Sequence, residues 1–201
     1  MKESLLSILR NKKSDLCTYR EATNRLSHLI AADAALLVKE KPISFSSPLL
    51  PCKGRALAEN IVLIPVLRSG IALLSSFLYF FPDAAIGFLG IHRDEKTAKP
   101  ILYYEKLPPL SSQNLIFLLD PMIATGGTAI LSIEKILEKG ASPQQIHLIG
   151  IIGSTLGVRQ IATKYPKVHV HLTAIDKKLN AKKFIVPGLG DFGDRYFGPS
   201  V

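Results

Sequence analysis

The sequence predicts an α/β protein with a largely parallel central sheet flanked by helices. Short apolar runs of strand length alternate with amphipathic stretches of helical length along most of the chain. The chain has 201 residues and a 47% apolar fraction, which is enough for a sizeable core. No internal repeat or low-complexity linker interrupts it. We therefore expect a single domain over residues 1–201.

The N-terminal part is expected to be helical, because residues 19–39 carry an apolar stripe at helical spacing. Residues 42–53 are rich in serine and proline, which predicts a loop or short edge strands. A buried strand over 61–66 is followed by a turn and a helix over about 71–81.

The remaining elements continue the alternation of strands and helices. Apolar runs predict strands over 86–91, 115–119, 146–152, 168–174 and 184–186, an extended arm over 99–106, and helices over 128–139 and 157–164. A glycine-rich tail follows the last of these strands.

The stretch from Asp120 to Thr128 joins a buried strand to an amphipathic helix. Its paired glycines allow backbone N–H groups to approach an anion, and the helix N-terminus adds positive potential. The Asp120 carboxylate follows the carboxyl end of the strand, where open α/β sheets bind their ligands. Amides for a phosphate and an acid for sugar hydroxyls suit a ribose 5-phosphate. The alternative is a structural turn in which Asp120 caps the helix.

Charged residues follow three of the predicted strands: Arg68, Arg93 and Asp120. Parallel strands end at a common edge, so these side chains are expected to converge. Arginine pairs bidentately with phosphate oxygens, so two of them beside a phosphate cradle suit a diphosphate as well as a monophosphate. Taken singly, each arginine is equally consistent with a surface ion pair.

The tail over 187–198 contains Gly188, Gly190 and Gly193 in a formal G-x-G-x-x-G spacing. A dinucleotide-binding fingerprint is rejected, because that motif opens a helix and precedes an acid about 20 residues later. Dense glycines instead let the backbone approach the edge of a flat ligand. The aromatic side chains of the tail indicate that it docks on the body.

The formal net charge of +9 favours phosphate-bearing partners, from small polyphosphates to nucleic acid. The lysines are scattered as short pairs, at Lys12-Lys13, Lys177-Lys178 and Lys182-Lys183. They are not accompanied by an arginine-rich arm or an aromatic-interleaved RNA motif. Most of them are expected to be solvated, and nucleic acid is a disfavoured partner.

Other residues argue against membranes, disulfides and side-chain metal sites. The longest near-apolar run, 71–81, is about half the ~20 residues of a membrane span, and the first residues lack a signal-peptide apolar region. Cys17 and Cys52 have no zinc or thioredoxin spacing, and the five histidines form no metal-ligand pattern. We expect a cytoplasmic protein without a metal bound directly by its side chains.

Four motifs, in the same order, resemble those of the uracil phosphoribosyltransferase family. They are Leu67–Gly70, Arg93–Thr97, Asp120–Thr128 and Ile185–Gly198. The resemblance covers nearly the whole chain, and the tail motif is its most specific part. It implies a type I phosphoribosyltransferase fold with an N-terminal helical segment and a C-terminal hood over the base. The implied reaction, in pyrimidine salvage, converts uracil and 5-phosphoribosyl 1-diphosphate to UMP and diphosphate, with Mg²⁺ carried by the diphosphate donor.

The resemblance also implies roles for individual residues. Arg93 and Asp191 are the implied catalytic residues, and Ile185, Gly190, Asp191 and Phe192 would frame uracil. The implied donor-binding residues are Arg68, Arg93, Asp120, Pro121, Met122, Ile123, Ala124, Thr125, Gly126, Gly127, Thr128 and Asp191. A homo-oligomer, dimeric or larger, is implied, and GTP binding is a further expectation that the family raises.

Three departures from the family pattern bear on turnover rather than on the donor site. Lys96 stands where an acid is usual, Lys177-Lys178 replace small or polar residues, and residues 154–157 replace an Ala-Pro-Glu-Gly-like stretch. The competing hypothesis is an RNA-binding pyrimidine regulator on the same fold, motivated by the net charge. A purine or orotate transferase is disfavoured, because such enzymes usually have two adjacent acids at the position where this chain has Asp120-Pro121.

Overall fold

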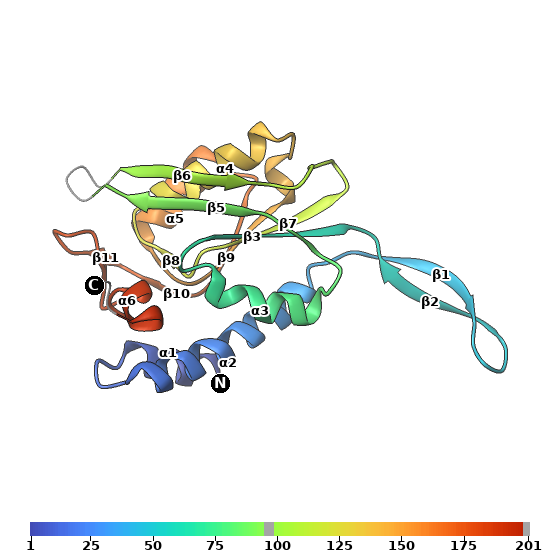
Figure 1. Ribbon diagram of the computed structural model, residues 1–201, viewed down its shortest axis with the longest axis horizontal. Helices are drawn as coiled ribbons and strands as arrows, with labels where there is room; N and C mark the ends of the chain where they lie inside the picture. Colours follow the sequence, from blue (N-terminus) through green and yellow to red (C-terminus); the bar gives the residue numbers. More distant parts are fainter. Residues whose placement is uncertain (95–98, 199–201) are drawn as a thin grey trace.

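The computed structural model describes residues 1–94 and 99–198. Its centre is a twisted sheet with the strand order β10-β9-β7-β3-β5-β6, in which β4 also pairs with β3 and β8 with β9 (Figure 1). The strands are β3 (Asn60–Leu67), β4 (Ala85–Ile86), β5 (Phe88–Arg93), β6 (Pro100–Lys106), β7 (Asn114–Leu119), β8 (Met122–Ile123), β9 (Ile146–Ser154) and β10 (His169–Asp176). All these pairings are parallel except that of β6 with β5, so the predicted largely parallel sheet is confirmed.

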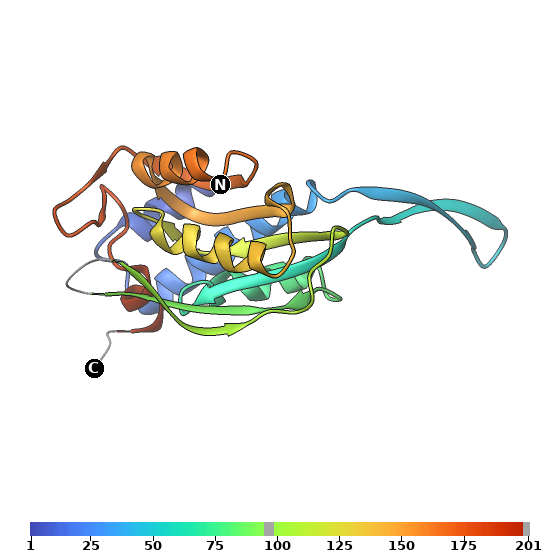
Figure 2. The same cartoon turned by 90° about the horizontal axis from the view of Figure 1, so that it is seen from above.

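Helices cover both faces of the sheet (Figures 1 and 2). One face carries α1 (Lys2–Arg10), α2 (Leu16–Ala35) and α3 (Ile71–Phe80), and the other carries α4 (Gly127–Glu138) and α5 (Thr155–Lys164), with a short 3-10 helix η1 (Pro143–Gln145) before β9. Strand β3 is buried on both sides: Ile61 and Leu63 join the core under α1–α3, whereas Val62 and Ile64 join the core under α4 and α5. A near-continuous apolar run therefore forms this strand, as parallel sheets require. No helix in the described ranges is long and apolar enough to span a membrane.

Residues 40–57 form a separate hairpin, β1 (Glu40–Ser46) and β2 (Pro51–Leu57), that projects from the body (Figures 1 and 2). The prediction of a loop or short edge strands here was wrong, because the two strands pair only with each other and not with the central sheet. The reason is visible in the burial pattern: no position is buried and most are exposed, including Phe45, Leu49 and Leu50. Without a buried face, the sequence shows little of the alternation that marks a strand.

The C-terminal segment folds over the carboxyl edge of the sheet as a hood made of β11 (Lys178–Leu179), β12 (Ile185–Val186) and α6 (Phe192–Phe197). Helix α6 was not expected in a glycine-rich tail. It forms because the Asp191 side chain caps it, accepting a hydrogen bond from the Asp194 N–H at 3.0 Å. Gly188 is required in the preceding turn, since it has a φ of +60° and a Cβ there would lie 2.0 Å from the Ile185 carbonyl oxygen.

Arg10 of α1 links the end of β10 to the hood. The Arg10 guanidinium donates to both carboxylate oxygens of Asp176, at 2.7 and 2.8 Å, and to the Gly188 carbonyl at 2.9 Å. The Gly188 N–H in turn donates to Asp176 at 2.8 Å. These hydrogen bonds, led by those from Arg10, hold the pKa of Asp176 below its usual value. The N-terminal helical segment thus sets the position of the hood.

Candidate active site

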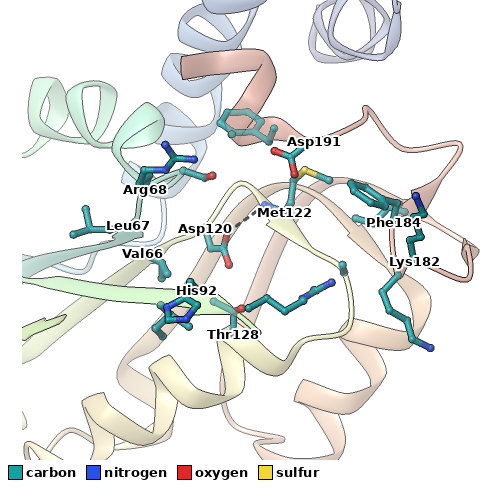
Figure 3. A pocket seen from close by; sticks show the side chains of 18 of the residues that line it. Val66, Leu67, Arg68, His92, Asp120, Met122, Thr128, Lys182, Phe184 and Asp191 are labelled. Carbon is teal, nitrogen blue, oxygen red and sulfur yellow. Dashed lines mark hydrogen bonds between the residues drawn. The ribbon is translucent and has the colours of Figure 1, made fainter. Parts of the chain in front are cut away.

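A cavity of about 1090 Å³ lies between the carboxyl ends of β3, β5 and β7 and the hood (Figure 3). We call it the main cavity. Arg68 follows β3, Arg93 ends β5 and Asp120 follows β7, and all three line it. Their predicted convergence is confirmed, because β5, β3 and β7 are neighbours in the sheet and their carboxyl ends share one edge.

The loop before α4 forms a smaller cavity, which we call the cradle, lined by Arg93, Asp120 and residues 122–129. Gly126 begins the helix with a φ of +84°, and a Cβ there would lie 2.9 Å from the Gly157 carbonyl oxygen. Only glycine fits this position without strain. The first-turn amides of α4 precede the helical hydrogen-bond ladder, so this helix N-terminus suits an anion.

The cradle is supported from below by the segment 154–157, one of the departures from the family pattern. The buried Ser154 hydroxyl donates to the Ala124 carbonyl at 2.5 Å and accepts from the Gly157 N–H at 2.9 Å. Ser154 therefore caps α5 and fixes the loop of the cradle at once.

Asp120 is the buried acid of the site, with 8% of its surface exposed. Burial raises the pKa of its carboxyl to about 7, against the opposing effects of the Met122 N–H and the Arg93 charge. The Met122 N–H donates to the carboxylate at 3.4 Å, the contact drawn in Figure 3. Near neutral pH the group is therefore only partly ionised, and in either form its oxygens can accept hydrogen bonds from hydroxyl groups.

The hood brings the predicted base-binding residues to the main cavity, which Ile185, Gly190, Asp191 and Phe192 all line. Phe192 is 2% exposed and stacks on Tyr196, with ring centroids 5.5 Å apart. It is thus a fixed apolar wall rather than a mobile side chain. In Figure 3, Asp191 lies on the hood side of the cavity, above Asp120.

Helix α6 also contacts the turn after β3. The Arg68 guanidinium carbon lies 5.8 Å from the centre of the Phe197 ring. A Cβ on Gly193 would come within 3.2 Å of the Asp191 carboxylate and 3.9 Å of the Arg68 guanidinium. Hood and turn are therefore close enough for Arg68 and Asp191 to act on one ligand.

Not every predicted residue lines a cavity. Pro121 lines neither of the two, and its carbonyl instead accepts from the N–H groups of Ile151 and Ile152, at 2.9 and 3.1 Å. Ile123, Thr125, Gly126 and Gly127 line the cradle alone. Lys96 lies outside the described residues.

Sequence reasoning did not assign several lining residues to the site. They include Leu67, Ser69, His92, Asp94, Tyr103, Lys182, Lys183 and Phe184. Leu67, Ser69 and Asp94 lie within the quoted motifs and most of the others lie beside them, which was the available signal. The basic pair at 182–183 was interpreted as solvated surface. In the described ranges, no group of three or more His, Cys, Asp or Glu side chains is arranged to hold a metal ion.

The sheet order and the site at its carboxyl edge define the class first. Adenine phosphoribosyltransferase from Leishmania tarentolae aligns with a TM-score of 0.53 at 15% identity, over 75% of this chain and 71% of that one. That likeness shows the phosphoribosyltransferase fold. The AQ2163 protein from Aquifex aeolicus aligns with a TM-score of 0.92 at 30% identity, over 100% of this chain and 95% of that one.

The particular family follows from the sequence comparisons. The family model for uracil phosphoribosyltransferase matches residues 1–199. The uracil phosphoribosyltransferase of Campylobacter curvus is 41% identical over 195 residues, which cover 97% of this chain and 93% of that protein. The chain belongs to the uracil phosphoribosyltransferase family.

Proposed function

We propose that this protein transfers the phosphoribosyl group of 5-phosphoribosyl 1-diphosphate, the donor, to N1 of uracil in pyrimidine salvage. The products are UMP and diphosphate, and the whole chain acts as one phosphoribosyltransferase domain. One observation carries the proposal: a phosphate cradle, two arginines and the hood border a single cavity of about 1090 Å³. Family membership supports it independently.

The donor-binding roles follow from the chemistry of each wall. The cradle over 122–128 would hold the 5-phosphate through backbone amides and the hydroxyls of Thr125 and Thr128. Asp120, partly protonated at neutral pH, would bind the ribose hydroxyls. Arg68 and Arg93 would bind the diphosphate. Pro121 would shape the loop through its carbonyl contacts with β9 rather than touch the donor.

The reaction would break the C1–O bond to diphosphate through an oxocarbenium-like state, with N1 of uracil attacking C1. Arg93 would stabilise the charge that grows on the departing diphosphate. Asp191, on the hood side of the cavity, would act between donor and base. Its neighbours Ile185, Gly190 and Phe192 would frame uracil, largely through backbone groups and the fixed Phe192 wall. Catalysis would therefore rest on positioning and electrostatics rather than on a covalent nucleophile.

In this scheme Mg²⁺ would enter the site bound to the diphosphate of the donor. The acids lining the main cavity are Asp94, Asp120 and Asp191, and the described residues offer no three-ligand metal cluster. When bound with the diphosphate, Mg²⁺ would supply charge neutralisation to the leaving group. Arg68 and Arg93 would donate hydrogen bonds to the diphosphate oxygens that do not bind Mg²⁺.

We also propose that the protein is a cytoplasmic homo-oligomer. The hairpin of residues 40–57 supports the oligomer, because it projects from the body of its own subunit (Figure 2) and carries the exposed side chains of Phe45, Leu49 and Leu50. Such apolar side chains gain most by packing on another copy of the chain. Light scattering of the intact protein and of a Leu49→Ser/Leu50→Ser variant would test it: an unchanged monomeric mass in both would contradict it.

The enzymatic proposal is tested by incubating labelled uracil with the donor and Mg²⁺ and separating the products. UMP should form only when protein, donor and uracil are all present. An absence of UMP with correctly folded protein that binds the donor would sink the proposal.

A further inference from the structure

The loop between β11 and β12 brings two lysines to the main cavity. Lys182 and Lys183 both line it, and we call the pair the lysine lip. Figure 3 shows Lys182 beside Phe184, across the cavity from Asp120 and His92. Both lysines are exposed, and within the described part of the chain neither side chain forms a hydrogen bond or an ion pair.

The backbone at Lys183 is unfavourable for a lysine. Among the residues that the structure describes, Lys183 is the only non-glycine residue with a positive φ, which is +64°. The surrounding turn fixes this conformation: the Lys183 N–H donates to the Asn180 carbonyl at 2.9 Å, and the Asn180 N–H donates to the Phe184 carbonyl at 2.9 Å. Glycine would adopt it freely, whereas a side chain is strained there. A non-glycine residue kept in a strained conformation at a cavity rim indicates a functional role for its side chain.

The charges around the cavity indicate what that role is. Arg68 and Arg93 also line the main cavity, so the lip adds two more cations to it. These four cations outnumber the three acids that line the same cavity, Asp94, Asp120 and Asp191, so the cavity attracts a polyanion. Uracil is neutral and offers no such negative charge, whereas the donor carries phosphate groups at both ends.

We propose that Lys182 and Lys183 are donor-binding residues that attract 5-phosphoribosyl 1-diphosphate into the cavity and contact its phosphates. The inference rests on the proposed function, because it takes the donor from that reaction. Lysine suits the task as a compact charge on a flexible stem. The lip would raise donor affinity without reading the base.

The test uses Lys182→Gln and Lys183→Gln, with Lys177→Gln and Lys178→Gln as matched controls. Lys177 directly precedes β11 and Lys178 begins it, so the controls remove the same charge close to the same loop, but neither lines the cavity. Donor binding is measured by calorimetry without uracil, and KM is measured for both substrates, in about 0.02 M and about 0.3 M salt. Each lip variant should weaken donor binding about threefold to tenfold at low salt, and less at high salt. The control variants should bind the donor as tightly as wild type. The lip variants should keep the wild-type KM for uracil and the wild-type melting temperature.

A Lys183→Gly variant separates charge from folding. It should melt at the same or a higher temperature, because the backbone strain is relieved, yet bind the donor as weakly as Lys183→Gln. Donor affinity equal in lip and control variants, or a change confined to the KM for uracil, would overturn the inference. Intact donor binding without UMP formation by the wild type would overturn the proposed function instead, and calorimetry would still decide the lip. Wild-type protein that neither binds the donor nor makes UMP would overturn both.

Discussion

The buried Asp120 should cost the unliganded protein stability at neutral and alkaline pH, and Asp120→Asn should remove that cost. Burial raises the pKa of the folded carboxyl from 3.8 to about 7. Between these values the folded state binds the extra proton and the unfolded state does not. The free energy of unfolding therefore falls as pH rises through this window.

The size of the effect follows from the shift. About three pKa units at ~1.4 kcal/mol each give an upper bound of about 4 kcal/mol at pH 8. Local relaxation lets water reach the charged group, so we expect about 2 kcal/mol of this to be realised. Asparagine has nearly the same shape, and its carbonyl oxygen can still accept the Met122 N–H that bonds Asp120 at 3.4 Å.

Urea unfolding at about pH 5 and about pH 8 is the assay, with the variant compared with wild type at each pH. Asp120→Asn should be the more stable protein at the higher pH, and its advantage should shrink by about 1 kcal/mol at about pH 5, because the cost already begins above the unfolded pKa of 3.8. Other titrating groups, such as His147, are common to both proteins and cancel. An advantage that is the same at both pH values would refute the reasoning. The variant should also bind the donor more weakly, because it loses the ionisable group facing the ribose.

Three further predictions test the hood, its anchor and the core. Asp191→Asn should lose most turnover but keep its melting temperature, because asparagine also caps a helix; steady-state UMP formation at the wild-type rate would remove Asp191 from the proposed site. Arg10→Met should lower the free energy of unfolding by about 3 kcal/mol in urea titrations and raise the KM for uracil, since Asp176 and Gly188 lose their partner; an unchanged KM would show that the hood holds without it. Burial and the nearby His171 and His169 lower the pKa of His147 from 6.5 to about 4. The free energy of unfolding should therefore fall as pH drops from 6.5 to about 4, because the unfolded state binds the proton first. His147→Gln should reduce this acid loss in thermal melts at about pH 5, and an equal loss in both proteins would count against it.

The sheet and the convergence of the site were readable from the sequence, because both depend on periodic patterns. The apolar run 115–119 and the helical spacing after Thr128 define a strand-loop-helix unit, and β7 and α4 follow it closely. Once the strands are parallel, Arg68, Arg93 and Asp120 must share an edge.

The features that were missed depend on tertiary contacts. The hairpin of residues 40–57 has no buried face, and α6 depends on a single cap at Asp191 within a glycine-rich stretch. The support that Ser154 gives the cradle joins the end of β9 to a loop 30 positions earlier in the chain. The approach of Lys182 to the main cavity is set by how the hood folds back onto the sheet edge, which no local pattern encodes.

The central claim is that the cradle and arginines hold the donor while the hood selects uracil. The most direct measurement is nucleotide formation from the donor and Mg²⁺ with uracil, cytosine, orotate, hypoxanthine and adenine in parallel. The account predicts turnover with uracil alone. Turnover with another base, or salt-sensitive RNA binding with no nucleotide formed from any base, would contradict it.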